Sequence, residues 1–364
     1  MNAEHVYCCC QPGAEGALKR EVEAADVGWR FAFSRPGFVT FKLPALTPIE
    51  KVTPPRLVFA RAIGVSLAKI GSAETISSGA AEVWQTPAVQ ELVAEHGPLA
   101  LQVWQRDAAV PGHNGFEPGP TPLSIEARQA IEAAAPDGAL RDGEPSPRDT
   151  GWCLAIALVE PNQWWIGCHR LEGRISRWAG GVPPLELPEH AVSRAYLKMK
   201  ESLLWGRLPA AKGDEWIELG CAPGGAAQAL LDEGMRVIGV DPAEVDPSVE
   251  EHPRFEHVRH RATEAPRRHF MTARWLAADI NAAPHYTLGA VESVVTHHTA
   301  NIRGLVVTLK LPNWNLATPE KLAELLDRVR GWGYRDLRVR QLAFNRQELC
   351  VVALRSRGQR RLRR

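Results

Sequence analysis

The sequence of 364 residues lacks the features that mark membrane, secreted and zinc-binding proteins. It has no apolar run of about 18 residues, so no membrane-spanning helix is predicted. Its start lacks a basic segment followed by an apolar core, so no secretory signal is predicted and we expect a cytoplasmic protein. None of its seven cysteines stands in a Cys-x-x-Cys pair, which leaves a zinc site and a redox motif unsupported. We therefore expect reduced, mostly buried thiols and no metal.

An excess of charge is also missing, because the formal net charge is only +1. This value argues against a general binder of polyanions. Positive charge gathers instead at the end of the chain, where six arginines fall within residues 355–364. The segment 357–364 is interpreted as a basic tail, which either lies along phosphates or is simply solvated.

Residues 216–242 carry the most informative pattern. The apolar residues Trp216, Ile217 and Leu219 lead into a turn at Gly220, and a short alanine-rich helix follows and ends at Gly234. A second apolar strand then ends at Asp241. Ligands of open α/β sheets bind at this edge, and a carboxylate about 20 residues past the first glycine is placed to accept ribose hydroxyls. The stretch therefore predicts a site for a nucleoside-bearing cofactor.

The glycine pattern indicates which cofactor. It reads Glu-Leu-Gly-x-x-Pro-Gly-Gly rather than Gly-x-Gly-x-x-Gly, and Pro223 removes one backbone donor from the loop. A loop with fewer donors suits a ligand without a pyrophosphate, which favours S-adenosylmethionine (SAM) over NAD. The alternative is an ordinary turn in another α/β protein.

The length suits two or three domains. We predict a small α+β unit over residues 1–75, with a strand at 57–65, a second unit over 76–180, and a linker at 181–192. Residues 193–356 are predicted to alternate strands and helices in a seven-stranded, doubly wound sheet whose last strand is reversed. Within this part, Ser193 is the predicted N-cap of a helix over 194–205. Thr318 is expected to cap a later helix that Gly331 ends.

Four charged residues are expected to meet at one edge of that sheet. Asp279 and Lys310 follow the carboxyl ends of parallel strands, Glu348 begins the reversed strand, and Lys198 comes from the helix before the first strand. Each residue alone is typical of a surface charge, but together they suit the removal of a proton from a hydroxyl. We expect the second lysine and a cationic sulfonium to lower the pKa of Lys310 toward neutral pH.

The order of these motifs resembles the FtsJ-type ribose 2′-O-methyltransferases, which use a Lys-Asp-Lys-Glu tetrad with SAM. Within them the chain is most similar to the bacterial 23S rRNA cytidine 2′-O-ribose methyltransferases of the M type, which carry ferredoxin-like and THUMP units before the catalytic domain. The opening Val6-Tyr-Cys-Cys-Cys-Gln-Pro-Gly-Ala-Glu and the motif Gly181-Val-Pro-Pro-Leu also look like that family. Departures are Glu218 in place of the usual Asp, Cys221-Ala222 in place of Ala-Cys or Ala-Ala, and Ala226 in place of an aromatic residue.

The resemblance implies a Rossmann-like class I SAM methyltransferase that transfers a methyl group to a ribose 2′ oxygen of RNA, most closely a cytidine of large-subunit rRNA. Lys310 is the implied base, and Lys198, Asp279 and Glu348 position it and the ribose. The implied cofactor-binding residues are Ser193, Glu218, Gly220, Cys221, Ala222, Pro223, Gly224, Gly225, Asp241 and Asp279. The expected partner is RNA, no membrane association is expected, and a monomer is favoured. The alternatives are another RNA, such as tRNA or a messenger 5′ end, and a SAM-binding assembly factor without turnover.

A cluster of Arg170, Arg174, Arg177 and Trp178 lies just before the linker. Arginines beside an exposed aromatic residue can stack on unpaired bases. The other interpretation is an ordinary surface with one packed tryptophan. We expect residues 1–180 to carry most of the RNA affinity.

Overall fold

The structure is a computed structural model that describes residues 1–143, 149–173, 175–356 and 358. It forms two compact units, Met1–Pro184 and Leu185–Arg364. The division falls inside the linker expected at 181–192. Most of the basic tail at 357–364, and Arg174 of the arginine cluster, lie outside the described residues.

The first unit is built on one seven-stranded sheet in the order β2-β3-β1-β4-β7-β6-β5. Its strands are β1 (Asn2–Cys9), β2 (Arg30–Arg35), β3 (Phe38–Pro48), β4 (Ala62–Ile70), β5 (Ala100–Gln105), β6 (Trp152–Glu160) and β7 (Gln163–Arg170). Its helices are α1 (Glu15–Ala24), α2 (Ile76–Gln85), α3 (Pro87–His96) and α4 (Pro122–Ala133).

This single sheet differs from the expected division at residue 75. β4 from the first predicted unit pairs antiparallel with β7 from the second, with Val65 opposite Cys168 and Ile70 opposite Trp164. The exposed edge of β4 is thereby covered, as the unpaired hydrogen-bonding groups of an edge strand require. Residues 1–184 are therefore one structural unit rather than two.

The strand expected at 57–65 is wrong in its first half, since β4 begins at Ala62. The backbone N–H groups of Val58 and Phe59 donate to the carboxylate of Glu21, not to a neighbouring strand. A side chain on α1 therefore satisfies groups that an apolar pattern assigns to a sheet.

The second unit holds a seven-stranded sheet in the order β10-β9-β8-β11-β12-β14-β13. The strands are β8 (Glu215–Leu219), β9 (Arg236–Val240), β10 (Phe255–Val258), β11 (Trp275–Ala278), β12 (Gly304–Lys310), β13 (Asp336–Arg340) and β14 (Glu348–Leu354). β8 to β12 pair in parallel, and β14 pairs antiparallel with β12 and β13. The predicted doubly wound sheet with a reversed last strand is confirmed.

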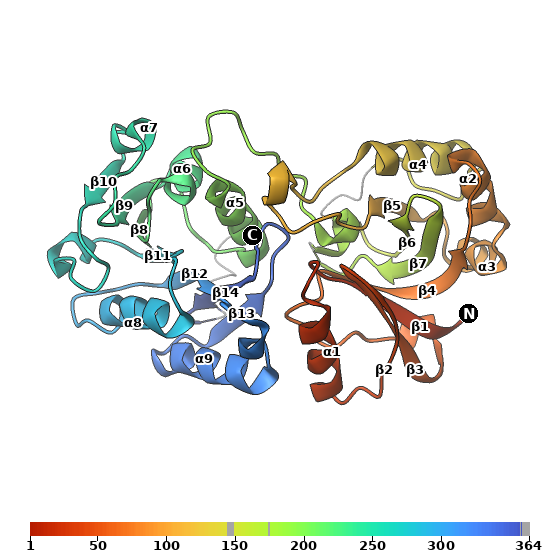
Figure 1. Cartoon of the computed structure of the whole chain (residues 1–364), viewed down its shortest axis with the longest axis horizontal. Helices are drawn as coiled ribbons and strands as arrows, with labels where there is room; N and C mark the ends of the chain where they lie inside the picture. Colours follow the sequence, from red (N-terminus) through yellow and green to blue (C-terminus); the bar gives the residue numbers. More distant parts are fainter. Residues whose placement is uncertain (144–148, 174, 357, 359–364) are drawn as a thin grey trace. The chain divides into compact units, whose positions relative to one another are not determined.

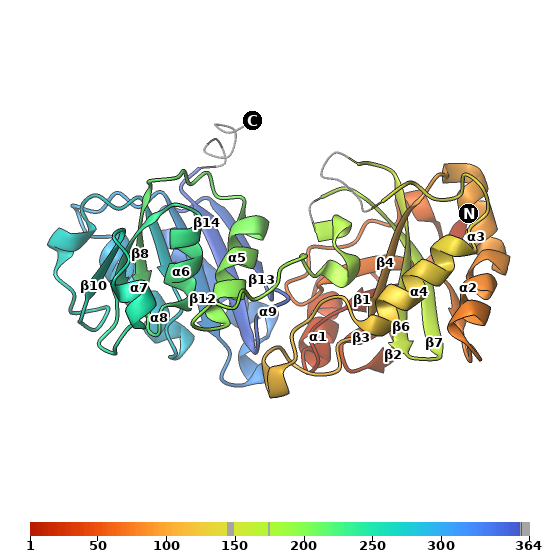
Figure 2. The same ribbon diagram turned by 90° about the horizontal axis from the view of Figure 1, so that it is seen from above.

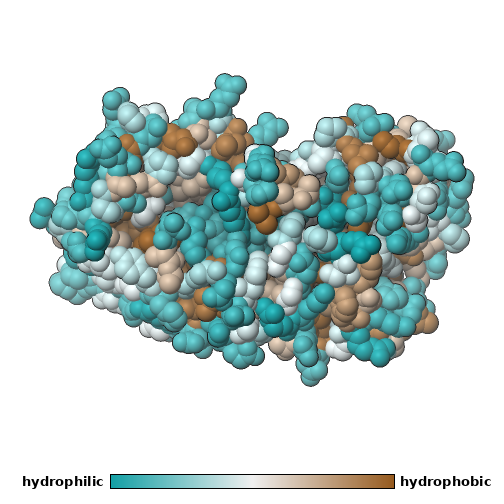
Figure 3. Space-filling view, in the orientation of Figure 1, coloured by the Kyte–Doolittle hydropathy of each residue, from teal (hydrophilic) through white to brown (hydrophobic). Residues whose placement is uncertain are grey.

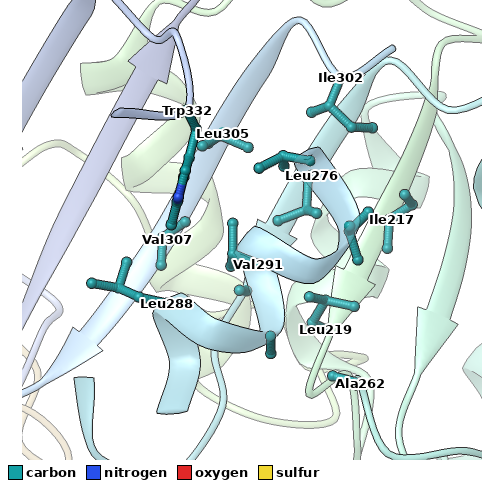
Figure 4. Packing of buried hydrophobic residues seen from close by; sticks show 14 of the residues in the cluster. Ile217, Leu219, Ala262, Leu276, Leu288, Val291, Ile302, Leu305, Val307 and Trp332 are labelled. Atoms are coloured by element: carbon teal, nitrogen blue, oxygen red, sulfur yellow. The ribbon is translucent and has the colours of Figure 1, made fainter. Parts of the chain in front are cut away.

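Helices cover both faces of this sheet. α5 (Ala195–Gly206) and α6 (Gly225–Asp232) lie over one face, and α8 (Pro284–Val295) and α9 (Pro319–Gly331) over the other (Figures 1 and 2). The short α7 (Pro247–Glu250) lies near β10. Figure 4 shows how Leu276 and Leu305 of the strands pack against Val291 of α8 in the core. A core closed on both faces holds the strand ends, and hence the site, in fixed positions.

Helix ends in this unit give mixed results. Gly234 follows α6 with a φ of 85°, and Thr318 Oγ1 accepts from Lys321 N at 3.4 Å, both as predicted. The predicted N-cap is wrong, since Arg194 takes the N-cap position of α5 in place of Ser193, whose hydroxyl makes no hydrogen bond. α9 ends at Gly331 as predicted, although the glycine with a left-handed conformation is Gly333.

The seven cysteines are all buried and free, as expected of reduced thiols. No helix in the described parts of the chain is long and apolar enough to cross a bilayer. On the face seen in Figure 3, hydrophobic side chains form only small patches among hydrophilic ones.

Candidate active site

The loop between β8 and α6 is shaped by glycines that leave no room for a side chain. Gly220 has a φ of +81°, and a Cβ there would lie 3.0 Å from the Cα of Ile280. Gly224 has a φ of +118°. A Cβ on Gly225 would lie 2.2 Å from Ser193 Oγ, so this position needs glycine for the segment before α5 to pack against it. The loop therefore lies close to both Ser193 and the end of β11.

Asp241 follows β9 and lies beside this loop. Its Oδ2 accepts from the N–H of Ala222 at 3.2 Å, and its Oδ1 accepts from Ala243 N at 2.9 Å. These bonds fix the carboxylate next to Pro223, while each oxygen keeps a lone pair for a further donor. Cys221 is buried, and burial together with Glu218 raises the pKa of its thiol. That thiol is therefore an inert packing group.

Glu218, on β8, is a buried carboxyl group in need of a partner. It is 1% exposed, and its Oε2 makes no hydrogen bond in the structure. Burial, together with the charges of Asp279 and Asp241, raises its pKa well above the usual value. A buried carboxyl group without a donor is costly. The position is therefore suited to a cationic ligand group.

Lys198, Asp279, Lys310 and Glu348 are brought together in a closed ring of ion pairs. Lys198 Nζ contacts Asp279 Oδ2 and lies 2.9 Å from Glu348 Oε1. Lys310 Nζ lies 3.1 Å from Asp279 Oδ1 and 2.5 Å from Glu348 Oε2. Each lysine thus bridges both carboxylates, at the strand edge where the sequence placed them.

Comparisons with known proteins concern the domain that carries this ring. The model of the family described as FtsJ-like methyltransferase matches residues 191–280, from the residues before α5 to the end of β11. The chain carries an FtsJ-like methyltransferase domain. The sheet and this match confirm the Rossmann-like methyltransferase part of the predicted fold class and the methyltransferase class, whereas the ferredoxin-like and THUMP units stay predictions.

Relatives extend beyond the FtsJ-like domain. A protein of Halorhodospira halophila named ribosomal RNA large subunit methyltransferase M is 28% identical over 361 residues, which is 95% of each chain. The protein of that name from Aromatoleum aromaticum is 26% identical over 98% of this chain and 96% of its own. Among solved structures, Aeropyrum pernix fibrillarin with natively bound SAM is 17% identical and covers 55% of this chain and 82% of that chain. Its TM-score of 0.34 is too low to add to the assignment.

The residues around the glycine loop between β8 and α6 fit SAM, the cofactor that the sequence predicts. SAM carries two cationic groups, a sulfonium and an ammonium, and a ribose with two hydroxyls. Asp241 can accept hydrogen bonds from the ribose. Glu218 Oε2 and Ser193 Oγ are polar atoms without hydrogen bonds in the structure. A cavity lined by Lys198, Glu218, Ala226 and Asp279 lies between α5, α6 and the strands.

The ion pairs of the ring show that the pKa expected for Lys310 is wrong. Burial by itself lowers the pKa of Lys310, but Asp279 and Glu348 outweigh it and raise that pKa above its usual value. The second lysine was expected to lower it, yet the two carboxylates lie between the lysines. Glu348 is 3% exposed, and although burial favours its neutral form, Lys198 and Lys310 lower its pKa to about 2. Without other ligands, Lys310 is therefore an ammonium group and Glu348 a carboxylate near neutral pH.

The two lysines of the ring differ in access. The side chain of Lys310 is 26% exposed, whereas that of Lys198 is 9% exposed. A ribose hydroxyl that approaches from solvent therefore reaches Lys310 first. This difference supports the role that the sequence predicts for Lys310.

Two residues that support the ring were not predicted. Glu201, on α5 and 1% exposed, accepts from the N–H groups of Ala343 at 2.8 Å and Phe344 at 2.9 Å. Asn345, in the loop before β14, donates through Nδ2 to Glu348 Oε1 at 3.3 Å. Together they fix the loop that leads into Glu348. The one available signal was that Glu201 follows Lys198 by three residues, which puts both on one helix face.

The arginine cluster before the linker has structural contacts. Arg177 donates to the carbonyl oxygens of Gly173, Asp149 and Leu171. The Arg170 guanidinium lies 5.3 Å from the ring centroid of Trp152. Trp178 is half-buried. A role of this cluster in RNA binding stays a prediction.

Proposed function

We propose that the protein transfers a methyl group from SAM to a ribose 2′ oxygen of RNA, and that its substrate is a cytidine of large-subunit rRNA. The ring of Lys198, Asp279, Lys310 and Glu348 beside the glycine loop carries this proposal. Proton removal from a weakly acidic hydroxyl needs a base held in place, and the ring holds a lysine with two carboxylates. The relatives' name supports the choice of RNA.

The mechanism assigns one role to each part of the ring. SAM, when bound, supplies a methyl group on a sulfonium sulfur that leaves as a neutral thioether. Asp279 and Glu348 hold Lys310 so that its nitrogen faces the 2′ hydroxyl. Lys310, in its neutral form, takes the hydroxyl proton as the oxygen bonds to the methyl carbon. Lys198 holds both carboxylates in place. Fixing the two reactants together contributes on the order of 7–11 kcal/mol in favourable cases.

A high pKa of Lys310 is compatible with this role. Asp279 lines the cavity that would hold SAM, and the positive charge of the cofactor there would oppose the effect of this carboxylate and lower the pKa of Lys310. Only the fraction of Lys310 that is neutral then reacts. The rate therefore depends on pH, a consequence taken up in the Discussion.

The remaining assignments concern partners. Residues 1–180, for which the family resemblance implies a ferredoxin-like part at 1–75 and a THUMP-like part at 76–180, carry most of the RNA affinity. A cleft built for one ribose does not by itself select one nucleotide in a large RNA. The protein acts as a monomer in the cytoplasm.

The test is a map of 2′-O-methyl positions in RNA from cells with and without the gene. We expect one cytidine of large-subunit rRNA to lose its methyl group without the gene and to regain it when the purified protein and SAM are added to that RNA. A lost position in tRNA or at a messenger 5′ end would move the substrate to that RNA. Unchanged maps and no transfer in vitro would reject the proposal in favour of an assembly factor without turnover.

A further inference from the structure

Aromatic side chains form a continuous layer on one face of the sheet of residues 1–184. The ring of Tyr7 lies over Gly64 and Gly167, where added Cβ atoms would approach it to 2.3 Å and 2.4 Å. Phe38 stacks on Tyr7 with centroids 5.6 Å apart, and Trp165 lies 5.2 Å from Phe38. The glycines allow the first ring to lie flat, so the layer is set by the backbone.

The layer reaches the surface at its outer end. Phe33 stacks on Trp165 with centroids 5.6 Å apart and an interplanar angle of 20°. Both rings are half-buried, whereas Tyr7 and Phe38 are fully buried. Trp165 Nε1 donates to Ser66 Oγ at 2.8 Å, which fixes the plane of the indole. The outer rings are thus ordered in advance of any ligand.

Two cations lie over these outer rings. The guanidinium of Arg35 is 4.9 Å from the ring centroid of Phe33. The ammonium of Lys69 is 5.3 Å from that of Trp165 and 5.8 Å from that of Phe33. Both cations are exposed, and across the described residues neither has a carboxylate within ion-pair distance. Positive charge is therefore available here for an anionic partner.

We propose that Phe33, Arg35, Lys69 and Trp165 form a docking surface for an unpaired stretch of RNA. Unpaired bases stack on aromatic rings and on guanidinium planes, and the plane of Arg35 extends the stack by one layer. Lys69 meets a phosphate of the same strand. A strand of bases and phosphates matches both the rings and the charge. This inference rests on RNA being the substrate, as proposed above.

The surface recognises the strand without choosing its sequence. The rings of Phe33 and Trp165 meet any base through its π face, and the ammonium of Lys69 meets the phosphate that every nucleotide carries. The surface therefore holds RNA while the ribose is chosen elsewhere. Mutations here should raise the KM for RNA and leave kcat unchanged.

The test compares the full-length protein with two variants, Phe33→Leu and the pair Arg35→Ala with Lys69→Ala. Binding of a fluorescent single-stranded oligonucleotide is measured by anisotropy across salt concentrations. Loss of one stacking partner is worth about 1–3 kcal/mol, so Phe33→Leu should weaken binding at least about 5-fold. The charge variant should weaken binding and lower the salt slope by about 1 to 2.

The matched control is the pair Phe31→Leu with Lys19→Ala. Lys19 Nζ lies 3.9 Å from the ring centroid of Phe31, which is exposed. In the pairing of β2 with β3, Phe33 lies opposite Thr40, whereas Phe31 lies opposite the adjacent residue, Phe41. Phe31 therefore points to the opposite face of the sheet. This control should bind RNA as the wild type does.

Three results would overturn the proposal: unchanged affinity in both test variants, equal weakening in the control, or equal weakening for duplex RNA of the same sequence. Failure of the proposed function is separate, because the wild type would then transfer no methyl group to RNA. If the wild type does transfer it, Phe33→Leu should keep its kcat at saturating RNA and raise only KM.

Discussion

The lysines of the ring and the cations of the docking surface are held in different ways. Lys198 and Lys310 each form ion pairs with two carboxylates, at the edge of a sheet that helices cover on both faces. Arg35 and Lys69 are exposed and lie over aromatic rings without ion pairs to described residues. The ring fixes the positions of its charged groups, although removing them from water costs free energy. The docking surface leaves the charges of Arg35 and Lys69 available to a partner. The comparison separates a site for chemistry from a surface for binding.

The largest expected effect comes from removing the accessible lysine of the ring. Lys310→Ala should lower kcat by about 10²–10⁴-fold, the usual contribution of a general base. SAM affinity and fold should change little, because the proposed cofactor site is the loop from Gly220 together with Asp241. Single-turnover methylation and calorimetry measure the two effects. Lys200→Ala is the control, since Lys200 lies on α5 near Lys198 but pairs with Glu233 outside the ring. Equal losses in both variants would contradict a special role for Lys310.

A smaller effect is expected from the carboxylate that supports the ring. Glu201→Ala leaves the N–H groups of Ala343 and Phe344 unpaired, which costs about 1–3 kcal/mol each. The loop before Glu348 then shifts, and a misplacement of about 1 Å can lower kcat about 10²-fold. Glu201→Gln keeps one carbonyl acceptor, so its stability and its kcat should lie between those of the wild type and of Glu201→Ala. Thermal unfolding and kcat are measured together. Lost stability with unchanged kcat would make Glu201 a folding residue only.

On the cofactor side, Asp241→Ala should weaken SAM binding by about 2 kcal/mol, as the loss of hydrogen bonds to a charged group does. The variant should keep kcat at saturating SAM, because Asp241 is not part of the ring. Calorimetry and a SAM titration of the rate check both statements. Unchanged SAM affinity would remove Asp241 from the cofactor site.

The pH dependence of the rate sharpens the comparison further. Asp279 and Glu348 raise the pKa of Lys310, so its neutral fraction grows about 10-fold per pH unit below that pKa. If neutral Lys310 is the base, kcat should rise with pH from 6 to 9. RNA affinity should stay nearly constant over this range, since arginine and exposed lysine remain charged. A flat kcat profile would mean that Lys310 acts as an ammonium group.

The sequence predicted what depends on local patterns and strand order. The turn at Gly220, Asp241 at a strand end, and the meeting of Asp279, Lys310 and Glu348 follow from apolar strands and the direction of a parallel sheet. It did not predict contacts between distant segments. Glu201 binds residues more than a hundred positions later, and β4 joins the sheet through β7. The pKa of Lys310 was misjudged for another reason, because the prediction gave the second lysine and the sulfonium more weight than the two carboxylates that raise this pKa.

The most direct measurement is single-turnover methylation by Lys310→Arg with saturating SAM and RNA. Arginine keeps the positive charge that the carboxylates bind, but guanidinium does not release its proton near neutral pH. If the ring exists to present a base, the variant should react at less than about a tenth of the wild-type rate, a loss of more than ~1.4 kcal/mol. A rate above that level would show that Lys310 is not the base, and the role would pass to Lys198 or Asp279.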